Sequence, residues 1–304
     1  MSAHFVTALA ASAEAASGQH YPHGALYIVA TPIGNLADIS LRAMHVLALS
    51  DMIACEDTRH TQTLLRAYGI DKSPGQLLAL HQHNEAEASM SVIEQLRQGK
   101  RIAYVSDAGT PGISDPGARL VAAVREQRLR TIPLPGASSV TALLSVSGVI
   151  DSQSTGFVFC GFLPNKPAER DRAVQRLATE TRTVVVLEAP HRVEALAAAL
   201  SSLGTRAVTV GRELTKQFEE VATVAAQDLP AWFAQDANRL RGEFALVLHP
   251  LPAAPETAPD HRVLKLLLGQ LPLKTAVKLA AEITGEPKNT LYQAALDLKP
   301  HKSD

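Results

Sequence analysis

The 304-residue sequence is poor in aromatic side chains and in net charge. Aromatics make up only 4% of the residues, so any core must be built mainly from Ala, Leu, Val and Ile. The formal net charge is -1, so a phosphate-bearing partner would need a local basic patch, because the chain as a whole does not attract anions. With 46% hydrophobic and 19% charged residues, the composition is typical of a soluble globular protein with material for two cores.

Long apolar runs and paired cysteines are missing too. No apolar run approaches the roughly 20 residues that a bilayer-spanning helix needs, which indicates no membrane partner. Cys55 and Cys160 lie far apart in short apolar runs, which predicts buried free thiols and fits a reducing cytoplasm. Residues 1–23 are rich in Ala, no Lys or Arg precedes their apolar stretch, and Glu14 interrupts it. We therefore expect a disordered tail there rather than a signal peptide.

From residue 24 onward, short β-type runs alternate with helical patterns. ALYIVA at 25–30 and RIAYV at 101–105 are two such runs, each followed by a polar turn. This alternation predicts an α/β fold with a parallel or mixed sheet, whose functional loops follow the carboxyl ends of the strands. We expect an N-terminal α/β domain at 24–134 and a second α/β domain at 135–250.

The last fifty residues have a different pattern. The segment at 251–260 holds three prolines, which predicts a semi-extended linker. Helical patterns divided by Gly285-Glu286-Pro287 then fill 261–304 and resemble a helix-turn-helix. This extension has seven Lys and Arg against four Asp and Glu, so it supplies the local basic surface that the whole chain lacks.

The loop SDAGTPGISDPG at 106–117 is the strongest candidate binding segment. Its three glycines and two prolines shape a loop whose backbone can approach a ligand closely, and Asp115 is expected to cap the helix that follows. The alternative is an ordinary tight connection. The chain has no Gly-x-x-x-x-Gly-Lys-Ser/Thr, and no Gly-x-Gly-x-x-Gly follows the first strand, so nucleoside triphosphate and dinucleotide sites lose their main support.

A second turn, LPGASS at 134–139, leads into another helical pattern. Ser138 or Ser139 can cap this helix, or its free amides can bind a ligand carboxylate, and the sequence leaves both possibilities open. His81 and His83 alternate as metal ligands sometimes do, but no nearby cysteine or His-x-x-x-His helix accompanies them, so we expect no metal site.

Charged clusters follow four further β-type runs. One such cluster is usually a solvated loop with a salt bridge, but four at corresponding ends of a sheet predict a polar cleft. The clusters are Glu56-Asp57-Thr58-Arg59, His81-Gln82-His83-Asn84-Glu85, Glu188-Ala189-Pro190-His191-Arg192 and Gly211-Arg212-Glu213-Leu214-Thr215-Lys216.

Seven segments, in this order, resemble the motifs of the ribosomal RNA small subunit methyltransferase I family, within the tetrapyrrole-methylase superfamily. The resemblance runs from about Leu26 to His249 and extends into the Lys-rich C-terminal helices. The segments are TPIGNLADIS, CEDTRHT, LHQHNE, YVSDAGTPGISDPG, PLPGASS, LEAPHR and VGRELTKQFEE.

The resemblance implies S-adenosylmethionine held between two α/β domains, and 2'-O-methylation of a cytidine in the decoding region of 16S ribosomal RNA in the small ribosomal subunit. It also implies a homodimer and an RNA-binding role for the extension. The residues that it assigns to the methyl donor are Pro32, Asp107, Ala108, Gly109, Thr110, Pro111, Ser138, Ser139 and Leu187. Corrin-making relatives usually have a glycine-richer first loop and a Gly-Asp-Pro after the fourth strand. Those places here read ATPIG and SDA, which disfavours a tetrapyrrole substrate.

The chemistry of methyl transfer narrows the catalytic candidates. A sulfonium methyl is already activated, so the protein must align the ribose oxygen and accept a proton from a weakly acidic hydroxyl. We expect Glu188 or Glu213 to accept that proton, with His191 or Lys216 next. Arg59, Arg192, Arg212 and Lys216 are the expected phosphate contacts. The full set expected in the catalytic cleft is Asp57, Arg59, Glu188, His191, Arg212, Glu213 and Lys216.

Three alternatives stay open at this point. The same fold can carry a small-molecule, tetrapyrrole-type methyltransferase, although the basic helical extension argues against it. A nucleic-acid-binding protein without enzymatic activity would have no use for the glycine-proline loops. Any one of the charged residues can also belong to a salt-bridge network between the domains.

Overall fold

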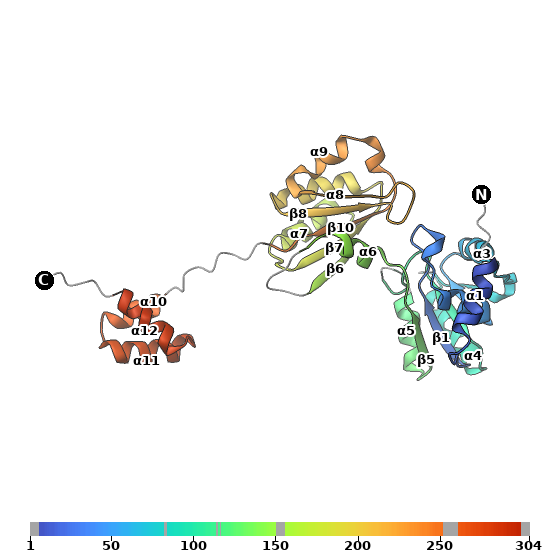
Figure 1. Cartoon of the computed structure of the whole chain (residues 1–304), viewed down its shortest axis with the longest axis horizontal. Helices are drawn as coiled ribbons and strands as arrows, with labels where there is room; N and C mark the ends of the chain where they lie inside the picture. The colour runs from blue at the N-terminus through green and yellow to red at the C-terminus, as the bar shows by residue number, and fades with distance from the viewer. Residues whose placement is uncertain are drawn as a thin grey trace. The chain divides into compact units, whose positions relative to one another are not determined.

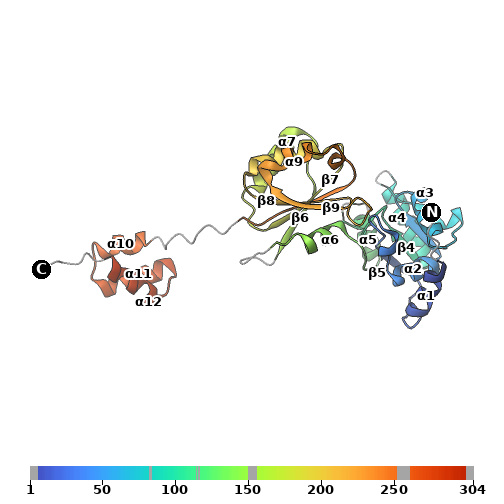
Figure 2. The ribbon, with the colours of Figure 1, turned by 45° about the horizontal axis from the view of Figure 1, so that its top comes forward.

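The computed structural model describes residues 6–81, 84–113, 115, 117–149, 156–251 and 261–298. It divides into two compact units, one within residues 1–251 and one within 252–304. The larger unit contains two separate five-stranded sheets (Figures 1 and 2). The α/β class and the helical extension are thus confirmed, whereas the boundaries at 134/135 and 250/251 stay predictions.

The first sheet is fully parallel, with the strand order β3-β2-β4-β1-β5. Successive residues of each strand point to opposite faces of the sheet, and helices cover both faces. The central strands are therefore apolar throughout. Tyr27 packs beneath α2 and α3, while Leu26 faces α4 and α5. The strands are β1 (Ala25–Val29), β2 (Met52–Cys55), β3 (Leu77–Ala79), β4 (Ile102–Val105) and β5 (Arg130–Leu134), and the helices are α2 (Leu41–Leu49), α3 (Thr58–Ala67), α4 (Glu85–Arg97) and α5 (Gly117–Glu126).

The expectation of a disordered tail was wrong for residues 6–16. They form helix α1 (Val6–Ala16), which packs against α2 and covers part of the first core. Ala16 and Tyr21 are buried there. Alanine has the highest intrinsic helix propensity, and a small apolar face is enough once a partner surface exists. The same Ala content that looked featureless in sequence therefore favours this helix.

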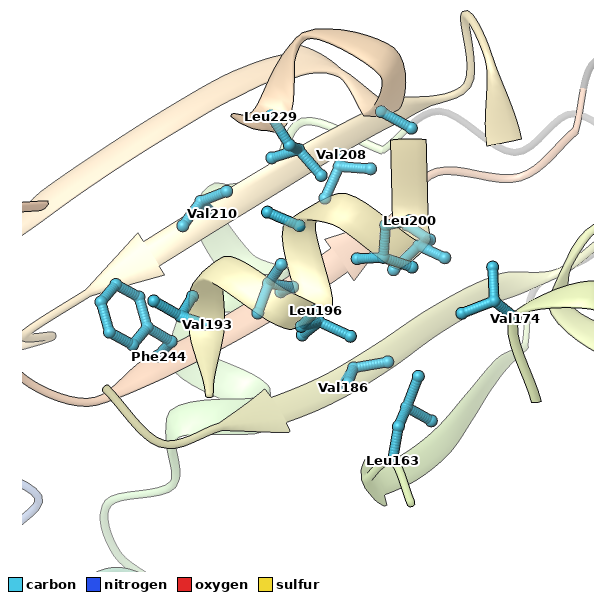
Figure 3. Packing of buried hydrophobic residues seen from close by; sticks show 14 of the residues in the cluster. Leu163, Val174, Val186, Val193, Leu196, Leu200, Val208, Val210, Leu229 and Phe244 are labelled. Atoms are coloured by element: carbon cyan, nitrogen blue, oxygen red, sulfur yellow. The ribbon is translucent and has the colours of Figure 1, made fainter. Parts of the chain in front are cut away.

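The second sheet is mixed, with the strand order β6-β7-β10-β8-β9. β6 and β7 are parallel, and β10 runs antiparallel to both of its neighbours. Helices α7, α8 and α9 cover one face over a large hydrophobic core (Figure 3), while α6 packs on the other face. The strands are β6 (Phe157–Phe162), β7 (Thr183–Glu188), β8 (Ala207–Arg212), β9 (Glu220–Ala225) and β10 (Phe244–Leu248), and the helices are α6 (Ser139–Val146), α7 (Pro167–Leu177), α8 (Val193–Leu200) and α9 (Leu229–Ala234).

The smaller unit is a three-helix cluster of α10 (Arg262–Leu268), α11 (Leu273–Thr284) and α12 (Lys288–Asp297). Gly285 ends α11 in the left-handed conformation (φ 76°), and Pro287 stands at the N-cap of α12, so the Gly-Glu-Pro turn divides the helices as the sequence predicts. Leu264, Val277 and Leu291 form its core.

Both cysteines are free thiols. Cys55 is buried as expected, and burial raises its pKa to about 11. Cys160 is only half-buried, because β6 is an edge strand, so this part of the expectation was wrong. Within the part of the chain that the structure describes, no helix has the length and apolarity needed to span a membrane.

Candidate functional site

A cavity of about 380 Å³ lies where the loops after β4 and β7 meet the N-terminus of α6. This volume is within the range of roughly 300–1,000 Å³ that is typical of small-molecule sites. Loops that follow strands of the first sheet and strand residues of the second sheet both contribute to its walls. The lining residues are Ile33, Glu56, Ser106, Asp107, Ala108, Gly109, Thr110, Ile113, Asp115, Ser138, Ser139, Val140, Phe162, Leu187, Glu188, Ala189, Pro190, Leu214, Glu243, Phe244 and Ala245.

The loop after β4 is fixed to the loops beside it. The amide of Thr31 donates to the Gly109 carbonyl (2.9 Å), and the Gly109 amide donates to the Thr31 carbonyl (3.1 Å). The Thr110 hydroxyl donates to the Ala137 carbonyl at 3.0 Å. Gly109 has a positive φ (80°), and a Cβ there would lie 3.2 Å from Cγ2 of Ile33. The backbone conformation therefore favours glycine, and the close packing leaves little room for a Cβ.

Asp115 holds the far end of this loop in place. Its carboxylate accepts hydrogen bonds from the amides of Gly112 (2.7 Å) and Ile113 (3.2 Å). It also accepts from the amide of Gly117, the first residue of α5, at 2.8 Å. The sequence assigned Asp115 to capping this helix, and these bonds show it bracing both the loop and the helix start.

The N-terminus of α6 points to the same cavity. Ser138 occupies the N-cap position, but its side chain makes no capping hydrogen bond. Both Ser138 and Ser139 line the cavity. Of the two possibilities left open by the sequence, the geometry favours ligand contact for the Ser138 hydroxyl.

Most of the residues assigned to the methyl donor lie together. Asp107, Ala108, Gly109, Thr110, Ser138, Ser139 and Leu187 all line the cavity. Pro32 and Pro111 do not, although each directly precedes or follows a lining residue. Their role as donor contacts stays a prediction.

Glu188 is the one candidate catalytic residue that lines the cavity. It ends β7, and its side chain is fully buried (0% exposed) beside the Arg192 guanidinium, with Nε 3.0 Å from Oε1. Oε1 also accepts a hydrogen bond from the amide of Ala189 at 2.9 Å. Within the described residues, Oε2 has no hydrogen-bond partner. A buried carboxylate oxygen left without a partner usually indicates a missing water, ion or ligand.

Arg192 is paired with neighbouring groups of the chain. Its side chain is 17% exposed and is held by Glu188 and by the carbonyl of Leu163. The guanidinium therefore positions Glu188 and balances its charge. Contact between Arg192 and RNA phosphates stays a prediction.

The carboxylate that faces the cavity after β2 is Glu56, not Asp57. Asp57 is the N-cap of α3 and accepts hydrogen bonds from the amides of Arg59 and His60, which lower the pKa of its carboxyl. Glu56 accepts from the amide of Asp107 (3.3 Å). Burial raises the pKa of Glu56, and although the hydrogen bond from Asp107 opposes this, the nearby acidic side chains add to it.

Glu213 and Lys216 pair with each other beside the cavity rather than in it. The Lys216 ammonium lies 2.8 Å from Glu213 and 3.0 Å from Glu243, and the Glu243 amide donates to Glu213 at 3.0 Å. Burial by itself would raise the pKa of Glu213, but the hydrogen bonds from Lys216 and Glu243 lower it overall. Glu243 lines the cavity, and sequence reasoning missed it because it directly precedes an apolar strand.

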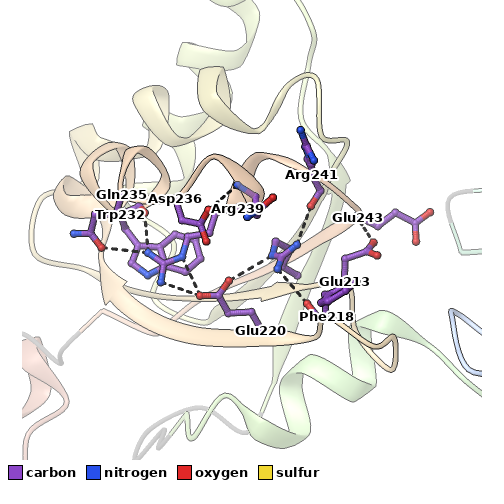
Figure 4. A network of polar contacts seen from close by, with 11 residues as sticks. Glu213, Phe218, Glu220, Trp232, Gln235, Asp236, Arg239, Arg241 and Glu243 are labelled. Atoms are coloured by element: carbon purple, nitrogen blue, oxygen red, sulfur yellow. Dashed lines mark hydrogen bonds and ion pairs between the residues drawn. The ribbon is translucent and has the colours of Figure 1, made fainter.

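Arg212 belongs to a polar network centred on Glu220, which Figure 4 shows beside Arg239 and Trp232. Its guanidinium pairs with Glu220 and donates to the carbonyls of Phe218 and Arg241. Glu220 also pairs with Arg239, which stacks over the Trp232 ring at 4.1 Å. These contacts give Arg212 a structural task in fixing the loop after β8.

The remaining candidates are more exposed. The Arg59 side chain is 92% exposed beside Asp57, and His191 is exposed next to the cavity residue Pro190. His83 lies outside the described residues. No group of three or more His, Cys, Asp or Glu side chains that could hold a metal occurs among the residues that the structure describes.

Sequence comparison decides the family. Residues 25–230 match the model for "Tetrapyrrole (Corrin/Porphyrin) Methylases", and residues 254–299 match "RsmI C-terminal HTH domain". The ribosomal RNA small subunit methyltransferase I of Escherichia coli O157:H7 is 45% identical over 278 residues, which cover 90% of this chain and 95% of the relative. The chain belongs to the ribosomal RNA small subunit methyltransferase I family.

Further relatives agree with this assignment. The ribosomal RNA small subunit methyltransferase I of Xylella fastidiosa is 46% identical over 276 residues, with 88% of this chain and 98% of the relative covered. Among solved structures, a cobalt precorrin-4 methyltransferase aligns with a TM-score of 0.56 at 17% identity, covering 75% of this chain and 95% of its own. At that identity the likeness shows a shared fold and does not extend to the substrate.

Proposed function

We propose that this chain transfers a methyl group from S-adenosylmethionine to the 2'-hydroxyl of a cytidine in the decoding region of 16S ribosomal RNA. The observation that carries the proposal is the cavity lined by Glu188, whose Oε2 has no partner among the residues that the structure describes, in a chain whose close relatives are named as ribosomal RNA methyltransferases. The proposal includes the homodimer and the cytoplasmic location that the family resemblance implies.

The cavity suits the methyl donor chemically. S-adenosylmethionine is cationic at sulfur and at its amino group and carries one carboxylate. Glu56, Asp107 and Glu243 line the cavity and favour cationic groups, while the N-terminal amides of α6 favour a carboxylate. Gly109 lines the cavity, and Gly136, just before the lining residues Ser138 and Ser139, packs closely on the end of β1, since a Cβ on Gly136 would lie only 2.8 Å from the Cβ of Ala30.

When bound, S-adenosylmethionine supplies a methyl group activated on its sulfonium sulfur. The protein then has to hold the ribose oxygen in line with that methyl group and accept the hydroxyl proton. Oε2 of Glu188 is the proposed acceptor, because Glu188 belongs to the cavity lining and this oxygen is buried without a partner among the described residues. The ion pair with Arg192 and the hydrogen bond from the Ala189 amide hold Oε1 and so fix the orientation of the carboxylate.

The C-terminal unit is proposed to bind RNA phosphates. Lys265, Lys274, Lys278 and Lys288 are all exposed on its three helices. Such side chains can neutralise phosphates without contacting the bases. The extension would therefore increase the affinity for RNA without selecting the nucleotide to be methylated.

Two isosteric variants test the assignment of the base. Glu188→Gln keeps the shape and removes the charge, so the single-turnover rate at saturating donor should fall by about 10²–10⁴-fold. Glu213→Gln is the matched control, because Glu213 is held by Lys216 outside the cavity. The assay would use labelled donor with small ribosomal subunits or deproteinised RNA, and a thermal melt of each variant. A near wild-type rate for Glu188→Gln, in a folded protein, would rule out this carboxylate as the base.

A further inference from the structure

Phe162 is an aromatic side chain that is exposed and still lines the cavity. It is 49% exposed at the end of β6. Among the described residues, Phe162 and Ile113 (40% exposed) are the large apolar side chains that are both exposed and part of the cavity wall. They come from different halves of the larger unit, one from the second sheet and one from the loop after β4. Neither is needed to fill a core.

A β-bulge turns Phe162 toward the cavity. In β6, Val158 and Cys160 pack on the helix-covered face of the sheet, and Phe159 packs on the opposite face. Strict alternation would place Phe162 with Val158 and Cys160. Instead, the register with β7 shifts between Phe159 and Gly161, and Gly161 has a positive φ of 61°.

The shift changes the face on which Phe162 lies. Phe162 now pairs with Leu187, just as Phe159 pairs with Val185, and all of these residues belong to the face that carries α6 and the cavity. Bulges commonly redirect a side chain beside an active site, and a slip of one residue moves every later side chain to the other face. The exposed ring is thus held at the mouth by the backbone, next to the strand that ends in Glu188.

We propose that Phe162 stacks on the base of the nucleotide to be methylated and so positions its ribose beside Glu188, with Ile113 as a second apolar contact. This rests on the proposed function. The acidic lining of Glu56, Asp107 and Glu243 repels phosphates, so the part of the nucleotide that enters this mouth is the uncharged base. Proteins that recognise single-stranded RNA commonly stack unpaired bases on exposed aromatic rings.

The test compares two phenylalanines of the same strand. Phe157 is 48% exposed at the other end of β6 and does not line the cavity, so Phe157→Ala removes an equally exposed ring without touching the mouth. Phe162→Ala should lower kcat/KM for the small-subunit RNA by roughly 5- to 150-fold, the range for one base–aromatic stack, while the Kd for S-adenosylmethionine stays unchanged. Phe162→Tyr should restore most of the loss, and Phe157→Ala should behave like wild type.

Several results would overturn the inference. Full activity in Phe162→Ala, or an equal loss of kcat/KM in Phe157→Ala, would do so. So would Phe162→Leu, if it restored kcat/KM as completely as Phe162→Tyr. A Kd for S-adenosylmethionine that rises in parallel with the loss in Phe162→Ala would assign the ring to the donor. Binding of a decoding-region oligonucleotide to donor-saturated protein gives a readout without methyl transfer. Equal affinity of wild type and Phe162→Ala there overturns the stacking role, whereas a wild-type protein that binds donor and transfers no methyl group contradicts the proposed function instead.

Discussion

Two glycines of one loop offer a test of how the donor site is built. Gly109 and Gly112 both lie in the loop after β4 with positive φ, 80° and 86°. A Cβ on Gly109 would meet Cγ2 of Ile33 at 3.2 Å, whereas a Cβ on Gly112 would meet nothing within 4 Å. Gly109→Ala and Gly112→Ala therefore share the backbone strain, and only the first adds crowding at the cavity wall.

The shared strain sets the expected change in stability. A non-glycine residue in the left-handed region costs about 1–2 kcal/mol. For a unit of this size, each kcal/mol lowers Tm by roughly 2–4 °C, so both variants should melt about 2–8 °C below wild type. Differential scanning calorimetry without ligand measures this directly, and we expect the two decreases to be similar.

Donor affinity should separate the two variants. In the free protein, Ile33 can move a few tenths of an ångström into the cavity that it lines with Gly109. A bound donor fills that space and removes this route, so the crowding cost appears on binding. This crowding costs about 1 kcal/mol, the low end for overpacking. The Kd of Gly109→Ala for the donor should therefore rise roughly fivefold.

Isothermal titration with S-adenosylmethionine measures the difference in affinity. Gly112→Ala should bind the donor as wild type does once its lower stability is allowed for. An equal loss of affinity in Gly112→Ala would attribute the effect to loop strain, and wild-type affinity in Gly109→Ala would show that the donor does not press on this wall. Either result would refute the reasoning.

Two further predictions concern regions away from the cavity. Removing residues 260–304 should leave donor binding intact but weaken binding to RNA. The slope of log affinity against log salt should fall by ~0.7–0.9 for each of the two or three phosphate contacts that are lost. Unchanged RNA methylation at moderate salt would contradict this prediction. His249 is hydrogen-bonded to Thr209 (2.8 Å), and burial, with the nearby Arg206 charge, lowers its pKa below 6.5. The unfolded chain therefore binds this proton first, and stability should fall as pH drops below about 6.5 toward the folded pKa. Denaturant melts across this pH range measure the free energy of unfolding, which should depend less steeply on pH in His249→Asn than in His20→Asn. His20→Asn serves as the control, because His20 is exposed.

The strands that sequence reasoning found and missed differ in where they lie. The interior strands β1, β2, β4, β7 and β8 coincide with β-type runs of the sequence, because interior strands are buried on both faces. The two strands that were missed, β5 and β9, are edge strands. β5 starts with an exposed Arg130 and contains Pro133, which is tolerated at an edge, while β9 alternates partly buried and exposed residues. The exposed residues of both strands and the proline of β5 therefore weakened the sequence signal.

For the candidate site, the sequence predicted the chain segments that form it but not the single side chains that face the cavity. The loops that form the cavity were located from their glycines, prolines and charges, because these mark strand ends. Which residue of a cluster faces the cavity was not predictable, since neighbouring residues compete for local tasks. Asp57 is used as a helix cap, while Glu56 lines the cavity. Glu213 is held by Lys216, while one oxygen of Glu188 has no partner within the described part of the chain. Hydrogen bonds to backbone amides decide these outcomes, and they depend on the folded geometry.

The charge distribution explains how a chain with net charge -1 can act on RNA. The cavity is lined by carboxylates, which suit a cationic donor and disfavour phosphate, so affinity for the RNA backbone must arise elsewhere. Exposed lysines are found on all three helices of the smaller unit, which follows a proline-rich segment of the sequence. Donor affinity should then be nearly independent of salt, and RNA affinity strongly dependent on it, because only the second involves phosphates. A protein that used one basic cleft for both ligands would lose both affinities together as salt rises.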